Sequence, residues 1–195
     1  LPPVVGVEPV DNFAAHEARK LFTHNCAHAT LGYLGWLVGC HYCHEALVHE
    51  RVRPTLDRAL SETGEALIRR FGFDRQEHRE HVEDLLRRFA NAELGDTCFR
   101  LGRDPIRKLA PHDRLVGAAR LCEETGVEPQ GVARVIAAAL RFDAKEDQSA
   151  VELQSRIAEQ GLPTVLREVC HISVDEALGR MVVAEYTLLA EWSHA

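Results

Sequence analysis

The sequence lacks the features that mark several large protein classes. It has no stretch of about 18 consecutive apolar residues, the length a membrane-spanning helix needs, so we expect no membrane partner. Its first ten residues lack the basic and then apolar segments of a secretory signal. The single methionine is Met181 and the chain starts at Leu1, so we interpret the sequence as one that has lost an N-terminal part.

Positive charge and cysteine are also scarce. The chain has 23 Lys and Arg against 30 Asp and Glu, a formal net charge of −7, which argues against a nucleic-acid partner. Six cysteines in 195 residues are too few for a disulfide scaffold. Without a secretory signal, this cysteine content predicts reduced thiols in a cytoplasmic protein.

Alternation of apolar and polar residues with period two is almost absent, which removes the main signal for β-strands. The strand-like run at 4–7 falls in residues 1–10, which we interpret as a linker or the remnant of a missing domain. Residues 11–195 predict an all-α domain of about nine helices. Composition supports a folded domain, because 46% of the residues are hydrophobic.

The first helix is expected to lie in the middle of this domain. It should start with Asp11 as its N-cap, run to about Val38 and stop at Gly39. Apolar side chains point in every direction around it, which is typical of a buried helix. Further helices are expected at 41–52, from Pro54 to 70, from the N-cap Asp74 to about 91, and at 111–125, 128–142, 146–160, 162–169 and 174–192, with a long ordered loop at 92–110.

One side of the first helix carries an unusual set of residues. Lys20, Asn25 and His28 fall within an arc of about 140° on an α-helical wheel. The same stripe continues in three glycines: Gly32, Gly35 and Gly39. Because each glycine inside a helix costs about 1 kcal/mol relative to alanine, we expect something to approach this backbone closely.

These side chains suit removal of a proton from an alcohol. If Lys20 is buried, desolvation favours its uncharged amine, which is a competent general base. The Asn25 amide can donate to an oxygen that becomes negative, and His28 can hold a substrate hydroxyl. The spacing alone also fits a plain helix end, with Lys20 reaching to water, Asn25 as a cap and His28 as a core histidine.

Here the sequence resembles a known family over nearly its whole length. The Lys, Asn and His at 20, 25 and 28 match the signature of the polyol-specific long-chain dehydrogenases, and the chain resembles the C-terminal domain of their mannitol-1-phosphate 5-dehydrogenases. The segments that carry the similarity are Asp11–His28, Arg69–Asp74, Arg88–Asn91, Gly102–Leu109 and Asp113–Leu115.

The resemblance implies a metal-independent oxidation of a polyol that depends on NAD. Lys20 would take the hydroxyl proton, Asn25 would stabilise the alkoxide and His28 would orient the substrate. NAD would be bound mainly by an N-terminal Rossmann domain, and this chain has no Gly-x-Gly-x-x-Gly run that could mark one. We therefore expect the fragment alone to be inactive, with the missing Rossmann domain as its partner.

A cluster of cations lies in the glycine-containing segment after residue 92: Arg100, Arg103, Arg107 and Lys108. With the resemblance, Arg103, Arg107 and Lys108 are candidates for a clamp on the phosphate of mannitol 1-phosphate or fructose 6-phosphate. The same cations suit the carboxylate of a sugar acid, so a domain of the related fructuronate and tagaturonate reductases is one alternative function. A mannitol dehydrogenase domain is another. The plain interpretation is a solvated basic turn paired with Asp96 and Asp104.

Cys40-His41-Tyr42-Cys43-His44 matches the haem-attachment pattern, and such residues can also bind zinc. No second pair of ligands appears at motif spacing, since Cys98, Cys122 and Cys170 are isolated in the sequence. We therefore predict no bound metal and cysteines that pack as small hydrophobes. The alternative to an enzyme is a non-catalytic helical module that serves in protein interaction or in metal binding.

Overall fold

The computed structural model describes residues 12–192, and all the regular elements in that range are helices, apart from one β-bridge between Tyr42 and Thr97. The all-α prediction is confirmed, whereas the linker predicted at 1–10 lies outside the described residues. None of the described helices has the length and hydropathy needed to cross a membrane. The helices are α1 Phe13–Arg19, η1 Lys20–Asn25, α2 Cys26–Leu37, α3 Cys43–Val48, α4 Arg53–Phe71, α5 Arg75–Phe89, η2 Ala92–Leu94, α6 Cys98–Gly102, α7 Pro105–Lys108, α8 Val116–Glu124, α9 Gln130–Leu140, α10 Gln148–Gln160, α11 Leu162–Val169, α12 Ala177–Leu188 and η3 Leu189–Trp192.

Helices α1, η1 and α2 form one continuous rod, which confirms the long first helix. The predicted cap Asp11 lies outside the described residues. Asn12 caps the helix instead, because its side chain accepts a hydrogen bond from the Ala15 backbone N–H at 3.1 Å. Gly39 ends the rod in the left-handed region, with φ of 78°, where glycine carries no steric penalty.

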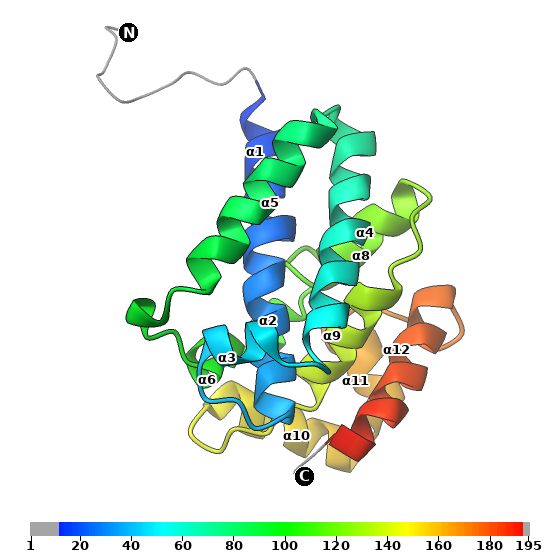
Figure 1. Cartoon of the computed structure of the whole chain (residues 1–195). Helices are drawn as coiled ribbons and strands as arrows, with labels where there is room; N and C mark the ends of the chain where they lie inside the picture. Colours follow the sequence, from blue (N-terminus) through cyan, green and yellow to red (C-terminus); the bar gives the residue numbers. More distant parts are fainter. Residues whose placement is uncertain (1–11, 193–195) are drawn as a thin grey trace, which may run out of the picture.

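Helices α2 and α9 form the centre of the molecule, with the other helices around them (Figure 1). On α2, Leu31, Tyr33 and Leu34 have no exposed surface, and the segment Val132–Leu140 of α9 is buried except at Arg134. Helices that are apolar all round must be covered on every side, so α4, α6 and α12 pack against this central pair. The prediction of a buried first helix is correct for α2, whereas α1 is largely exposed.

Helix α6 lies directly on the backbone of α2, and two of the predicted glycines explain why it can. A Cβ atom on Gly32 would lie 2.8 Å from the Cβ of Leu101 and 2.9 Å from the backbone N of Gly102. A Cβ on Gly35 would lie 2.6 Å from the Sγ of Cys98. The close approach predicted from the glycine stripe is therefore made by α6 of the same chain.

The expectation of a continuous loop at 92–110 is wrong, because η2, α6 and α7 lie within it. Thr97 caps α6 by accepting from the Arg100 backbone N–H at 3.1 Å, and Pro105 occupies the first turn of α7. These helices have only three to five residues, too short for the sequence periodicity to reveal. The predicted stop at Gly72 and N-cap at Asp74 are both confirmed.

The N-terminus of α9 is capped by a buried carboxylate from α4. Glu62 is 7% exposed, and its two oxygens accept from the backbone N–H groups of Gly131, at 2.8 and 2.9 Å, and of Val132, at 3.1 Å. The first N–H groups of a helix have no partner inside it, and a negative charge there also complements the helix dipole. This contact fixes the start of the central helix α9 against α4.

We expect Glu62→Gln to lower the free energy of unfolding by about 1–3 kcal/mol, because one acceptor oxygen becomes an amide that cannot accept from the α9 N–H groups. The urea midpoint measures this loss. Exposed Glu83 on α5 offers a control, and Glu83→Gln should leave the midpoint unchanged. Equal midpoints for the two variants would contradict the assigned role.

Two histidines of α5 are removed from water: His78 packs against α4, and half-buried His81 lies near Arg19 of α1. His78 is 5% exposed and neither of its ring nitrogens has a hydrogen-bond partner among residues 12–192. Its Nε2 would lie 2.8 Å from a Cβ on Gly64, so the ring packs directly on the α4 backbone. Burial, the nearby His81 and Arg19 lower the pKa of His78, and burial with Arg19 and Arg88 lowers that of His81.

These histidines should make the fold sensitive to acid. The unfolded chain binds protons below the ordinary histidine pKa of about 6.5, whereas the folded chain resists them, so stability should fall as the pH drops from about 7 to about 5. Urea midpoints across this range measure the slope. His78→Leu should flatten it, and His44→Gln, at the start of α3, should not. A midpoint that stays constant with pH in the unsubstituted chain would refute this account.

Candidate active site

The first helix changes its winding where the predicted catalytic residues begin. Between Lys20 and Asn25 it is a π-helix, and the Cys26 backbone N–H donates to the carbonyl of Leu21, five residues earlier. In this winding, residues five apart lie nearly above one another, so Lys20 and Asn25 come onto the same side of the helix. They share a hollow of about 420 Å³, lined by Glu17, Ala18, Lys20, Leu21, Phe22 and Asn25.

The expectation of a buried Lys20 is wrong for the described chain. Lys20 is exposed, whereas Asn25 is half-buried. The ideal α-helical wheel placed Lys20 on a helix assumed to be covered on all sides, but the covering helices lie mainly along α2, and the Lys20 side of η1 is left open. The hollow therefore presents the Lys20 amine and the Asn25 amide to the outside of this domain.

His28 lies beyond the hollow, under a different set of neighbours. Its ring stacks on Phe89 with centroids 4.1 Å apart, and His24 meets its edge at 4.7 Å. Its Nε2 lies 3.9 Å from Oδ2 of Asp96, and 22% of its side chain is exposed. Burial and the positive charges around it lower the pKa of His28 to about 3, so its imidazole is neutral.

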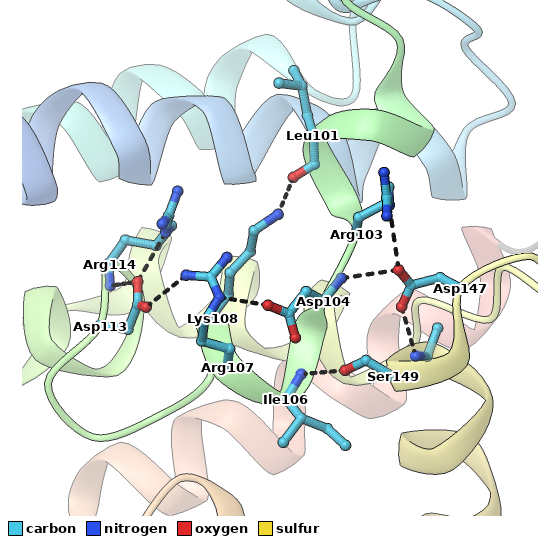
Figure 2. A network of polar contacts seen from close by, with 11 residues as sticks. Leu101, Arg103, Asp104, Ile106, Arg107, Lys108, Asp113, Arg114, Asp147 and Ser149 are labelled. Atoms are coloured by element: carbon cyan, nitrogen blue, oxygen red, sulfur yellow. Dashed lines mark hydrogen bonds and ion pairs between the residues drawn. The ribbon is translucent and has the colours of Figure 1, made fainter.

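The buried lysine of the chain is Lys108 on α7. It is 6% exposed, and its Nζ donates to the Leu101 carbonyl at 2.5 Å (Figure 2). Its Nζ also lies 5.7 Å from the Tyr33 ring centre. Burial and the charges of Arg114 and Arg107 lower its pKa to about 8. Lys108 can therefore supply a hydrogen-bond donor, and a fraction of neutral amine, next to the central helix.

The two predicted phosphate-binding arginines point into carboxylates of their own domain (Figure 2). Arg107 donates to Oδ2 of Asp104 at 2.5 Å and to Oδ2 of Asp113 at 3.2 Å, while Arg103 lies 3.7 Å from Asp147. Both arginine side chains remain more than half exposed. The structure thus brings Lys108 to the central helix and leaves Arg103, at the end of α6, and Arg107, on α7, largely facing solvent.

Sequence reasoning named Arg100 and Lys108 as cations but missed Arg114, and it placed none of the three beside His28. Arg100, Arg114 and Lys108 each help to lower its pKa, so three positive charges lie around one imidazole. The Arg114 side chain is 17% exposed and its Nε donates to Oδ1 of Asp113 at 2.9 Å. The only sequence signal was its place in the Asp113–Leu115 segment, since contacts between α6, α8 and α2 are not visible from spacing.

Metal-binding groups are not assembled in this structure. Among residues 12–192, no three His, Cys, Asp or Glu side chains are arranged so that they could hold a metal ion. Cys40 and Cys43 are free thiols, and burial raises the pKa of Cys43 to about 11, which disfavours the thiolate that binds metals. Cys26, Cys98, Cys122 and Cys170 are buried, as predicted.

Comparison with known proteins places these features in a family. Residues 12–187 match the model of the mannitol dehydrogenase C-terminal domain. The chain is 42% identical over 184 residues to a mannitol-1-phosphate 5-dehydrogenase of Bacillus licheniformis, covering 94% of this chain and 48% of that protein. It is 38% identical over 190 residues to the enzyme of the same name from an Exiguobacterium species, covering 97% and 50%.

The fold has a solved counterpart. The Pseudomonas fluorescens mannitol 2-dehydrogenase, in a ternary complex with NAD and D-mannitol, superposes with a TM-score of 0.75 at 22% identity, over 96% of this chain and 40% of that one. This likeness establishes the fold. The chain spans about half the length of the curated relatives that it matches. With the match over 12–187, the chain belongs to the mannitol dehydrogenase C-terminal domain family.

Proposed function

We propose that the chain is the substrate-binding and catalytic half of an NAD-dependent dehydrogenase that interconverts mannitol 1-phosphate and fructose 6-phosphate. The names of its curated relatives support this substrate pair, and the family match supports the role of the domain. The observation that carries the proposal is the π-helical turn, which puts Lys20 and Asn25 on one hollow with His28 nearby. The remaining half would be an N-terminal Rossmann domain.

Each of the three residues has a chemical role in this proposal. Lys20 takes the proton of the substrate hydroxyl, Asn25 donates to the oxygen that becomes negative, and neutral His28 accepts a hydrogen bond from a substrate hydroxyl. NAD, bound by the N-terminal domain, would accept the hydride. A lysine is a base only when its amine is uncharged, and removal from water favours that form, so exposed Lys20 needs a second domain to cover it.

The substrate phosphate is proposed to meet cations of the 100–114 region. Lys108, Arg103 and Arg107 are the candidates from the sequence, and Lys108 is the one beside the central helix. Arg100 and Arg114, whose charges also act on His28, extend this positive region. The same charges would suit a carboxylate, as in fructuronate or tagaturonate reductases, and a mannitol dehydrogenase would need no such anion site.

We expect Lys20→Ala, in the protein joined to its N-terminal half, to lower kcat at least about 10²-fold, because the proton acceptor is lost. Mannitol 1-phosphate oxidation measures kcat, and quenching of NADH fluorescence measures cofactor binding, which should persist. Lys145→Ala, at another exposed lysine, is the control. Near-normal turnover of the Lys20 variant would refute the catalytic role of Lys20, whereas no turnover even without the substitution would favour a non-catalytic helical module.

We expect Lys108→Met, in the same joined protein, to raise KM for mannitol 1-phosphate at least about tenfold, because a charged hydrogen bond to phosphate is lost. Inorganic phosphate should inhibit the unsubstituted enzyme competitively and the variant weakly. The melting temperature of the variant checks that it folds. If unphosphorylated mannitol is the better substrate and phosphate does not inhibit, the mannitol dehydrogenase alternative replaces this assignment.

A further inference from the structure

The segment 40–44, which matched a haem pattern, has a structural task that the proposed function does not use. Its backbone pairs with residues 96–98 in a short antiparallel bridge. The Cys43 N–H donates to the Asp96 carbonyl at 2.8 Å, and the Cys98 N–H donates to the His41 carbonyl at 2.8 Å. Two hydrogen bonds around the Tyr42–Thr97 pair therefore fix the backbone of Asp96, although it lies between η2 and α6.

The side chain of Asp96 is fixed as well, through two different oxygens. Its Oδ1 accepts from Nη2 of Arg100, one turn further along the chain. Its Oδ2 faces Nε2 of His28 at 3.9 Å, and 17% of the Asp96 side chain is exposed. Since Arg100 binds one oxygen, the other remains available for the histidine.

The other neighbours of His28 leave its ring little freedom. Phe89 covers one face, with an interplanar angle of 29°, and His24 meets the ring edge-on at 84°. The charged groups that act on His28 are His24, Arg100, Arg114 and Lys108, all of them potential cations. Asp96 is the carboxylate that the described residues place against this ring.

We propose that Asp96 is the positioning residue of His28: its carboxylate accepts a hydrogen bond from Nε2–H and so leaves the lone pair on Nδ1 for a ligand hydroxyl. A carboxylate that receives one ring N–H selects the tautomer and the orientation of the imidazole. The 3.9 Å separation is longer than a hydrogen bond, and such contacts in ligand-free sites often tighten when the ligand binds. The assignment of a hydroxyl as the ligand depends on the proposed function, whereas the assignment of the tautomer does not.

The tautomer is measured directly on the 195-residue chain. Two-bond ¹H–¹⁵N spectra of ¹⁵N-histidine-labelled protein at neutral pH distinguish Nε2–H from Nδ1–H, and loss of one signal set in His28→Gln assigns the resonance. We expect Nε2–H in the unsubstituted chain and a mixed or Nδ1–H state in Asp96→Asn. The control is Asp57→Asn, because Asp57 also pairs with an arginine four residues away, Arg53, but touches no histidine.

Two results would overturn the proposal: Nδ1–H at His28 in the unsubstituted chain, or Nε2–H retained in Asp96→Asn. An amide spectrum like that of the unsubstituted chain shows that the Asp96 variant folds. If it does not fold, Asp96→Glu keeps the carboxylate and should retain Nε2–H, and loss of Nε2–H in a folded Asp96→Glu would also count against Asp96.

Kinetic measurements on the protein joined to its N-terminal half test whether the orientation of the His28 ring affects substrate binding. Asp96→Asn should raise KM for the polyol substrate about tenfold with a smaller change in kcat, and Asp96→Glu should restore part of the loss. An unchanged KM, with the tautomer altered, would refute a role in ligand binding. If the unsubstituted protein oxidises no polyol, the proposed function fails while the tautomer result still decides whether Asp96 positions His28.

Discussion

The contact between α2 and α6 is the constraint on which the candidate site depends. Gly32 and Gly35 have no side chains, so the backbone of α6 can lie against the central helix. Gly102, on the α6 side of this contact, is in turn covered by Phe142, since a Cβ there would lie 2.6 Å from its ring. Because α6 is so close, Asp96, Arg100 and, one short helix later, Lys108 reach the surroundings of His28. A methyl group on Gly32 would lie 2.8 Å from the Cβ of Leu101, so α6 and α2 would have to move apart.

The π-helical turn is the second constraint, and it shows why a regular wheel is an imperfect guide. On the α-helical wheel, Lys20 and Asn25 are separated by about 140°. A π-helical turn contains more residues than an α-helical turn, so this angle between the two side chains becomes much smaller. The residue types and their spacing were informative, but the direction of each side chain depended on local winding. A π-turn is held by tertiary packing, and the sequence of η1 contains no proline or glycine that would reveal it.

Local signals were predictable and long-range pairings were not. Gly72, Asp74 and Pro54 marked helix ends correctly because each acts through its own backbone or its nearest neighbours. The burial of Lys108 was not predictable, since it depends on α2 and Tyr33, which are distant in the sequence. The same holds for Asp96, whose carbonyl accepts from the Cys43 N–H while the neighbouring Cys98 N–H donates to the His41 carbonyl. The grouping of Arg100, Arg114 and Lys108 around His28 thus needed the structure, whereas Lys20, Asn25 and His28 were selected from the sequence alone and stay a prediction.

Lys108 and Lys20 differ in which part of the protein shields them from water. Lys108 is desolvated by its own domain, so its altered pKa is a fixed property of the fold. Lys20 is left exposed at an open hollow, so its desolvation depends on what covers that hollow. If the covering body is the domain that carries the cofactor, the base becomes active only when the hydride acceptor is in place. Proton removal is then coupled to domain closure, because the same contact between domains brings the hydride acceptor and excludes water from Lys20.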